Sequence, residues 1–395
     1  MTSLTPSTLK HSVYILGTDA STTEHMASCL RGTSELIKSN VNLCATTPPV
    51  SLLTDASCFS SDRYTSRLGT TTLGRNMLYA PLLDSTQTVM QNISNKIPHG
   101  TVCLADQQTA GRGRGANAWY SPPGCLLFTF TFATKDGRNL PFAQYLLSLA
   151  LVKAVQSMPH CTTLPIKIKW PNDIYAQMMP AEVGEKNNQG SGTHNPSTTT
   201  TTTEYASFAQ PPQHGQYSKI GGVLCESTYD YESKSFVVIA GIGLNVTNEA
   251  PTTCLQSMHS DQQQREQEDN AASSGITREH VLASFFNTFE PMLEQFNING
   301  FDSFYDAYIE EWLHSGQTVM VCDLKDRRKQ KEHAQSFGST NEGGDEEEGE
   351  KTEVTIIGVA KSSGLLAVDQ NGQQFELLPD GNSFDFLKGL ISRKI

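Results

Sequence analysis

Alternating apolar and polar residues mark the strands of this chain. From residue 125 to 132, Phe128, Phe130 and Phe132 alternate with threonines, and this period of two predicts a half-buried strand. Further strands are expected at 78–80, 101–105, 166–170, 218–227 and 235–246. Because the loops between the last three need no helical crossover, we expect an antiparallel meander there.

Apolar positions at helical spacing predict helices elsewhere. They are expected at 84–97, 141–158, with Pro141 at the favoured first helical position, 277–296 and 303–313. Ser85 and Thr86 suit the cap of the first helix, a role compatible with facing a ligand, because helix starts bind polar groups well. Phe304, Tyr308 and Trp312 form a stripe on the last helix, which is typical of core packing.

Short strands return after Gly316. They are expected at 318–323, 353–360, 365–369 and 374–378, and the Asn371-Gly372 pair is a strong hairpin signal. We therefore expect a small β-barrel or sandwich over residues 314–395. A basic and then acidic run at about 325–352 is expected to interrupt it as a solvated loop.

Polar stretches divide the rest of the chain. Residues 1–72 are rich in Ser and Thr and show little period outside 12–17, so we expect an N-terminal extension of unknown role, part of it disordered. The main domain is expected at 73–313. It would carry a low-complexity insertion at about 178–218 and a Gln-rich loop at about 252–275.

Length and composition fit a protein of two or three domains, with 395 residues, 37% of them hydrophobic. The net charge of −12 argues against broad binding to nucleic acid or anionic membranes. Nine cysteines without a C-x-x-C pair indicate reduced intracellular thiols. No apolar run approaches the roughly 20 residues that cross a bilayer. Residues 1–18 hold one firm positive charge, Lys10, so the transit-peptide signal is weak and we expect a cytoplasmic protein, with an organellar form left open.

The segment DQQTAGRGRG, which ends at Gly115, carries the most distinctive chemistry. Gly111, Gly113 and Gly115 allow close backbone approach, so their N–H groups can converge on an anion. Arg112 and Arg114 add planar permanent charges suited to carboxylate or phosphate. A bare GRGRG run can also be a surface turn or an RG-type nucleic-acid contact. A dinucleotide-binding fingerprint is excluded because a strand follows rather than a helix, and no P-loop motif occurs.

Two lysine-containing motifs add candidate site residues. A Trp-Pro-Asn-Asp sequence is usually only a turn, but Lys169 and Asp173 flank this one at a strand end, where catalytic groups often lie on rigid supports. Lys219 is either a solvated strand-end lysine or a ligand contact, for which Gly221 and Gly222 leave room.

Five motifs stand in an order known from one family. They are QxxGRGRG at 108–115 with Trp119, KWPND at 169–173, KIGGV at 219–223, GxGxN at 241–245 and DGNSFD at 380–385. Each is weak alone, but together the chain resembles the biotin–protein ligases, and among them the eukaryotic holocarboxylase synthetases. The resemblance covers residue 73 to the C-terminus, less the insertions. It implies an α+β fold: a catalytic domain like that of class II aminoacyl-tRNA synthetases, with a mixed or antiparallel sheet and flanking helices, and a C-terminal SH3-like barrel.

The activity implied by this resemblance has two steps. Biotin and ATP give biotinyl-5′-adenylate and pyrophosphate, and the biotinyl group then passes to a lysine of a carboxylase carrier domain. The implied cofactor is Mg²⁺, and the implied partners are the biotin carrier domains of carboxylases. We expect no nucleic-acid or membrane partner, since residues 1–72 show no convincing helix-turn-helix, and a homodimer stays open.

The resemblance also assigns roles to residues. The catalytic set is Arg112, Arg114, Asp173 and Lys219, with Asp173 arranging Mg²⁺ through water. The biotin-binding set is Ser85, Thr86, Gln108, Gly111, Arg112, Gly113, Gly221 and Gly222. The set for ATP and the adenylate is Arg114, Trp119, Lys169, Asn172, Lys219 and Asn245.

Elementary chemistry is consistent with these roles. The biotin carboxylate must attack the α-phosphorus of ATP, and bringing two anions together requires concentrated positive charge. A loop that orders over the adenylate would also protect it from water. Two alternatives stay open. Lipoate–protein ligases share the fold, although the GRGRG and KWPND motifs fit biotin better. A catalytically silent biotin sensor or scaffold is the other, and the intact charged residues count against it.

Overall fold

The structure is a computed structural model. It describes residues 12–17, 42–44, 58–178, 217–248, 250–266, 275–322, 351–378, 382–385 and 390–393, with isolated positions between 24 and 30. The chain forms two compact units. The first consists of Met1–Ala176 and Ser218–Leu313, and the second of Gln177–Tyr217 and His314–Ile395.

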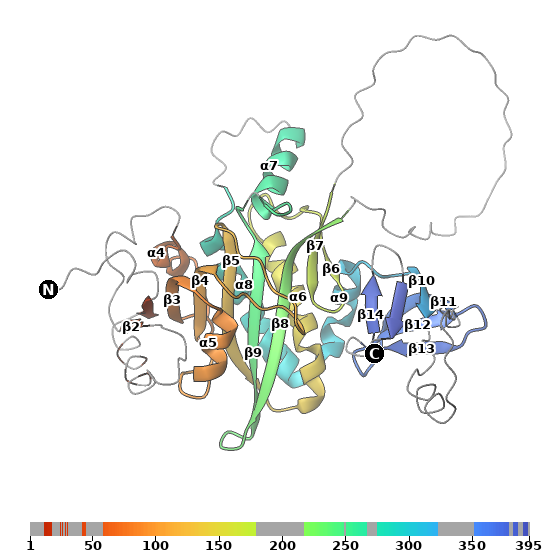
Figure 1. Cartoon of the computed structure of the whole chain (residues 1–395), viewed down its shortest axis with the longest axis horizontal. Helices are drawn as coiled ribbons and strands as arrows, with labels where there is room; N and C mark the ends of the chain where they lie inside the picture. Colours follow the sequence, from red (N-terminus) through yellow and green to blue (C-terminus); the bar gives the residue numbers. More distant parts are fainter. Residues whose placement is uncertain are drawn as a thin grey trace, which may run out of the picture. The chain divides into compact units, whose positions relative to one another are not determined.

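A nine-stranded mixed sheet organises the first unit (Figure 1). Its strands are β1 (Ser12–Gly17), β2 (Asn42–Cys44), β3 (Asn76–Leu83), β4 (Val102–Gln108), β5 (Cys125–Thr134), β6 (Ile166–Lys169), β7 (Asp173–Gln177), β8 (Tyr217–Asp230) and β9 (Ser235–Asn245). They lie in the order β2-β1-β3-β4-β5-β9-β8-β7-β6. Strands β3 and β4 are parallel, whereas the pairs β4–β5, β5–β9, β8–β9 and β6–β7 are antiparallel.

Strand β7 corrects the prediction of a simple turn after Trp170. Asp173 is its first residue and pairs with Lys169 of β6, so β7 lies between β6 and β8. Ile174 and Ala176 are buried while their neighbours are not, but this alternation lasts only five residues and begins directly after a Pro-Asn turn. The pattern was therefore too short to stand out in the sequence.

Helices cover the sheet. They are α4 (Ser61–Thr65), α5 (Thr86–Ile93), α6 (Ala143–Gln156), α7 (Leu255–Glu266), α8 (Arg278–Asn299) and α9 (Tyr305–Glu311), with 3₁₀ turns at Gly137–Phe142 and Phe301–Phe304. Pro141 lies inside the first 3₁₀ turn, so the expectation that it begins an α-helix was wrong. Helix α7 occupies part of the segment predicted as a Gln-rich loop, because a helix made mostly of polar residues gives no apolar periodicity to detect.

Aromatic packing fixes helix α8 against strand β5. Phe128 and Phe130 of β5 meet Phe285 and Phe286 of α8 edge-on, with ring centroids 5.1–5.9 Å apart. All four rings are buried, and each buried phenylalanine stabilises the fold by about 1.5–3 kcal/mol. The predicted aromatic stripe of Phe304, Tyr308 and Trp312 is likewise buried, which confirms its place in the core.

The N-terminal segment contributes to the main sheet. Strand β1 pairs antiparallel with β3, and Val13 and Ile15 join the hydrophobic cluster that contains Leu78 and Met90. The described part of residues 1–72 is therefore integrated into the first unit, and the structure places no boundary at residue 72. A strand-like pattern of six residues at 12–17 could not reveal a partner strand about sixty positions away.

The second unit contains a six-stranded sheet. Its strands are β10 (Thr318–Cys322), β11 (Lys351–Val359), β12 (Leu365–Asp369), β13 (Gln374–Leu377), β14 (Asn382–Asp385) and β15 (Leu390–Arg393), in the order β13-β12-β11-β10-β15-β14. The Asn371-Gly372 hairpin between β12 and β13 is confirmed: Gly372 has a φ of 82° and its N–H donates to the Asp369 carbonyl at 3.1 Å. Most of the two insertions predicted at 178–218 and 325–352 lies outside the described residues. In the described part of the chain, no helix is long and apolar enough to cross a membrane.

Candidate active site

The N-terminus of helix α5 gathers three of the predicted biotin-binding residues. Ser85 caps the helix, with its Oγ accepting the Thr88 N–H at 3.5 Å, so its cap role is confirmed. The Thr86 N–H donates to Gln108 Oε1 at 2.8 Å, and the Thr86 hydroxyl lies 2.9 Å from the Thr129 hydroxyl. These contacts fix two hydroxyls and one amide at the end of strand β4.

The glycine–arginine loop, residues 109–118 between β4 and β5, folds back as a short hairpin. The Trp119 N–H donates to the Gly111 carbonyl at 2.8 Å, and the Gly113 N–H donates to the Asn117 carbonyl at 2.8 Å. Gly111 is required, since a Cβ there would lie 2.5 Å from the Trp119 carbonyl oxygen. Among the three loop glycines only Gly115 has a positive φ, of 61°. The Gly113 amide therefore serves the hairpin in this structure, which differs from the expected convergence of all loop amides on an anion.

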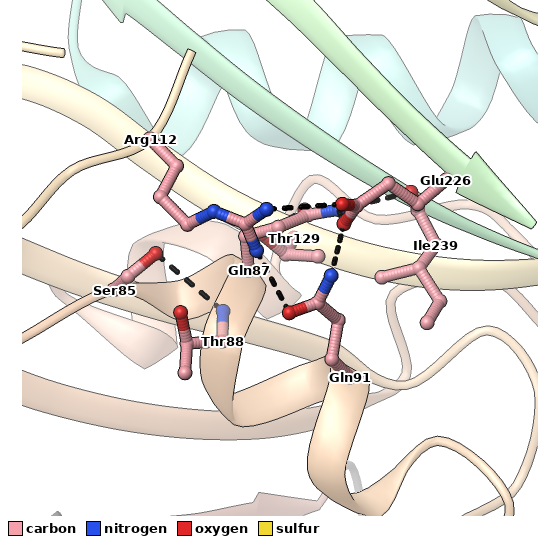
Figure 2. Close-up of polar contacts among 8 residues, drawn as sticks. All are labelled: Ser85, Gln87, Thr88, Gln91, Arg112, Thr129, Glu226 and Ile239. Atoms are coloured by element: carbon pink, nitrogen blue, oxygen red, sulfur yellow. Dashed lines mark hydrogen bonds and ion pairs between the residues drawn. The ribbon is translucent and has the colours of Figure 1, made fainter. Parts of the chain in front are cut away.

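Arg112 reaches across to helix α5 and strand β8, as Figure 2 shows. Its Nη1 donates to Gln91 Oε1 at 2.7 Å, and its Nη2 pairs with Glu226 Oε1 at 3.0 Å. Gln87 and Gln91 both donate to the other oxygen of the Glu226 carboxylate. Sequence reasoning did not identify Glu226, whose contacts come from residues more than a hundred positions away.

Arg114 connects the same loop to the KWPND turn. Its Nη1 donates to Asn172 Oδ1 at 3.0 Å. The Asn172 side-chain amide donates to the Val223 carbonyl at 2.5 Å, and the Val223 N–H returns a bond to the Asn172 carbonyl at 2.8 Å. Asn172 is 7% exposed, so the turn holds a fixed acceptor for Arg114 beside strand β8.

Lys219 and Asp173 form an ion pair next to this contact. Lys219 Nζ lies 2.6 Å from Asp173 Oδ1 and 5.8 Å from the centroid of the Trp119 ring. The Lys219 side chain is 40% exposed and that of Asp173 is 18% exposed, so both can meet a ligand from solvent. Lys169 lies opposite Asp173 in the β6–β7 register.

The two glycines of the GxGxN motif make room for site side chains. A Cβ on Gly243 would lie 2.6 Å from Cε2 of Trp119, and one on Gly241 would lie 2.5 Å from Oε1 of Gln87. Trp119 therefore rests directly on the backbone of β9, with its Nε1 buried and without a hydrogen-bond partner among the described residues. On β8, a Cβ on Gly222 would be 3.4 Å from Asp173 Oδ1, an ordinary contact, while one on Gly221 would lie 2.9 Å from Leu244. Gly221 is thus needed for sheet packing.

Asn245 is engaged in local structure. Its Nδ2 donates to the Thr252 hydroxyl at 3.0 Å, its Oδ1 accepts from Cys125 Sγ at 3.2 Å, and it is 5% exposed. Thr252 in turn donates to the Lys219 carbonyl at 2.8 Å, so Asn245 helps to place the strand that carries Lys219. Contact of Asn245 with a nucleotide stays a prediction.

The thiols and carboxylates near the site are the other groups that could take part in chemistry. Burial raises the pKa of the Cys125 thiol to about 12, and burial followed by the Glu226 charge raises that of Cys225 to about 12, so both stay protonated at neutral pH. No group of three or more His, Cys, Asp or Glu side chains in the described residues could hold a metal. Asp173 alone could contact a cation that arrives with a phosphate ligand.

Comparison with known proteins identifies the class to which this site belongs. Residues 79–245, which include the loop, the KWPND turn and Lys219, match the model of the biotin/lipoate A/B protein ligase family. Biotin–protein ligase 2 of Arabidopsis thaliana is 35% identical over 344 residues, which cover 86% of this chain and 84% of the relative. The Homo sapiens biotin–protein ligase is 29% identical, over 87% of this chain and 40% of its own length.

The chain belongs to the biotin–protein ligase family. A bifunctional ligase/repressor BirA from Bacillus subtilis is 37% identical over 108 residues, or 27% of this chain. Among solved structures, the biotin protein ligase from Aquifex aeolicus in complex with biotin and ATP aligns with a TM-score of 0.48 at 20% identity, over 76% of this chain and 95% of that one.

Proposed function

We propose that this chain joins biotin to carrier proteins in two steps, through biotinyl-5′-AMP. The observation that carries the proposal is the convergence of the glycine–arginine loop, the KWPND turn and Lys219 on one side of the sheet, around Trp119. Three positively charged side chains lie in this region: Arg112 and Arg114 from the loop and Lys219 from strand β8. The two segments are far apart in the sequence, and only the fold brings them together. Such a concentration of positive charge suits a reaction between two anions.

Biotin would bind at the start of helix α5. Its ureido ring needs a few aligned donors and acceptors beside apolar walls, and Ser85, Thr86 and Gln108 offer them from fixed positions. Gly111, Arg112 and Gly113 would line the carboxylate end. Gly222 would let it approach strand β8 without meeting a side chain, and Gly221 beside it would contribute through the packing of β8.

In the first step a carboxylate oxygen of biotin would attack the α-phosphorus of ATP. The bond from that phosphorus to the bridging oxygen breaks, and pyrophosphate leaves with the electron pair. Lys219 and Arg114 would stabilise the charge that grows on the phosphoryl oxygens, from strand β8 and from the loop. Trp119, Lys169, Asn172 and Asn245 would form the nucleotide side.

In the second step the amine of a carrier lysine would attack the biotinyl carbonyl carbon. The carbon–oxygen bond to AMP breaks, the amine loses a proton, and AMP leaves. The glycine–arginine loop would cover the adenylate until the carrier arrives, so that water does not hydrolyse it.

Asp173 would supply a single carboxylate ligand to Mg²⁺. The ion would arrive with ATP and would keep some of its water ligands. A bound Mg²⁺ would neutralise phosphate charge. Asp173 would hold it and, through its ion pair, orient Lys219 at the same time.

Other features belong to the same proposal. The six-stranded second unit would be an SH3-like barrel, and the first unit would share the fold of class II synthetases. The protein would act in the cytoplasm on biotin carrier domains of carboxylases, without nucleic acid, as a monomer or a homodimer.

The test is release of pyrophosphate from Mg-ATP by the full-length protein in the presence of biotin or lipoate. Release that depends on biotin, with biotinyl-AMP found by mass spectrometry, supports the proposal. Release with lipoate alone would make the chain a lipoate ligase. No release with either, despite biotin binding, would indicate a sensor.

A further inference from the structure

We propose that Glu226 is a positioning residue: it holds Arg112 in place and thereby presets the glycine–arginine loop for biotin. This inference rests on the proposed function of the loop. It concerns a residue of strand β8 that lies outside all five sequence motifs and whose carboxylate makes three polar contacts (Figure 2).

The Glu226 carboxylate joins three segments. One oxygen accepts Arg112 Nη2 at 3.0 Å, and the other accepts Gln87 Nε2 at 2.7 Å and Gln91 Nε2. Helix α5, strand β8 and the loop are therefore connected through one side chain. Gln87 lies in the first turn of helix α5, directly after Ser85 and Thr86, which would face biotin.

Arg112 is held from two sides. Gln91 Oε1 accepts its Nη1 at 2.7 Å while Glu226 accepts its Nη2, so the planar guanidinium is bracketed between the helix and the strand. Hydrogen bonds between ionised groups are roughly twice as strong as neutral ones. An arginine side chain that is not fixed loses rotamer entropy when a ligand orders it, and fixing it in advance removes that cost from binding.

The anchor itself is rigid. Gln87 is 3% exposed, donates a second bond to the Ile239 carbonyl at 3.3 Å, and accepts the Thr129 hydroxyl at 3.3 Å. It fits because Gly241 has no Cβ, which would lie 2.5 Å from the Gln87 amide oxygen. Through Gln87, the Glu226 carboxylate is fixed relative to strands β5 and β9, and Glu226 in turn fixes Arg112.

The role predicted for Glu226 concerns binding rather than stability. The side chains of Arg112 and Glu226 are 38% and 32% exposed, and ion pairs at such positions contribute little to the folding free energy. Loss of the carboxylate should therefore leave the fold intact and release the guanidinium. Biotin would then bind less tightly, and the loop would retain the adenylate less well.

The experiment compares the full-length wild type with Glu226→Gln and with Glu232→Gln, an exposed control on the β8–β9 turn that changes the net charge equally. Biotin-dependent pyrophosphate release with a saturating biotin carrier domain gives KM and kcat, and mass spectrometry of a reaction without the carrier gives the biotinyl-AMP released to solution. For Glu226→Gln we expect the KM for biotin to rise about tenfold, more released adenylate, and little change in kcat, since about 1.4 kcal/mol corresponds to a factor of ten. Glu232→Gln should match the wild type.

A second variant relocates the charge. Gln91→Glu combined with Glu226→Gln places a carboxylate on helix α5, at the other acceptor of Arg112, and should recover most of the biotin KM. An unchanged KM in Glu226→Gln, or no recovery in the double variant, would overturn the inference. An inactive wild type would instead overturn the proposed function, and this inference with it.

Discussion

At the scale of single residues, the ion pair of Lys219 and Asp173 is central to the proposed chemistry. Lys219→Ala should lower the rate of adenylate formation by about 100-fold or more, the usual effect of removing one preorganised charge from a transition state. The melting temperature should change little, because a side chain that is 40% exposed contributes weakly to stability. Single-turnover formation of biotinyl-AMP, with denaturation followed in parallel, measures both.

The matched control for that variant is Lys135→Ala, which removes an exposed lysine on the segment after β5. It should leave the rate unchanged. A Lys219→Ala protein that forms the adenylate as fast as this control would contradict the assigned role.

Site residues could be predicted from the sequence when they are charged or polar members of a recognisable motif. The structure brings Arg114, Asn172, Asp173 and Lys219 together, and it places Thr86 against Gln108. Their contacts with biotin and ATP stay predictions. The sequence did not identify Glu226, because a single acidic residue on a strand matches no motif. Its proposed role depends on contacts with side chains of helix α5 and of the loop.

At the scale of elements, the glycine–arginine loop is expected to act as a cover over the adenylate. Arg114→Gly removes the bond to Asn172 that fastens the loop to the KWPND turn, so it should release biotinyl-AMP into solution. Chromatographic separation of protein-bound and released adenylate measures the effect. Arg138→Gly, at an arginine whose side chain is 90% exposed, is the control. Retention equal to wild type in Arg114→Gly would exclude a covering role.

The Trp119 ring can pack on strand β9 because residue 243 is a glycine and leaves room for the indole. Gly243→Ala would place a Cβ 2.6 Å from the indole, so Trp119 has to move. Overpacking of this kind usually costs about 1–3 kcal/mol of folding stability, and displacement of Trp119 should weaken the binding of ATP as well. Gly69→Ala, where the nearest atom would be 3.5 Å away, is the control. Titration calorimetry with ATP checks this, and equal ATP affinity in both variants would show that Trp119 is not part of the nucleotide site.

Elements with a long apolar period were predictable, and short or polar ones were not. The alternation of phenylalanines and threonines identified β5 and also the face that meets α8. Strand β7 and helix α7 lacked that signal, the first because it is five residues long and the second because it is mostly polar. Strand β1 was visible as a pattern, but its pairing with β3 depends on contacts across the chain.

At the scale of the whole molecule, one carboxylate connects distant parts of the first unit. Glu290 of α8 accepts the N–H groups of Thr71, Thr72 and Leu73 at 2.7–2.9 Å. Burial opposes its ionisation, but these backbone hydrogen bonds outweigh that effect and hold the pKa of Glu290 below its usual value. The folded pKa is below the unfolded one, so this stabilisation is present above the unfolded pKa and is lost as the pH falls through the folded pKa.

Glu290→Gln should therefore lower the free energy of unfolding at pH 7 by about 1–3 kcal/mol, the cost of losing charged hydrogen bonds. The difference from wild type should shrink as the pH falls through the lowered folded pKa of Glu290, where the wild-type carboxylate becomes protonated. Urea denaturation at several pH values measures it, with the exposed Glu294→Gln of the same helix as control. A difference that does not depend on pH would show that Glu290 acts through packing alone.

The division of the whole chain was only partly predictable. Composition separated the C-terminal strands from the main domain, since turn signals and short alternations begin after Gly316. It could not show that strand β1 completes the first sheet, because the Ser- and Thr-rich residues around it resemble an unattached extension.

The central claim is transfer of biotin to a carrier lysine, and mass spectrometry of a purified biotin carrier domain tests it directly. The domain is incubated with the full-length protein, Mg-ATP and biotin, with lipoate in a parallel reaction. We predict a mass gain of one biotinyl group on one lysine, absent with lipoate and abolished or strongly slowed by Lys219→Ala. A gain with lipoate alone, or no gain while the protein still binds biotin, would contradict the account.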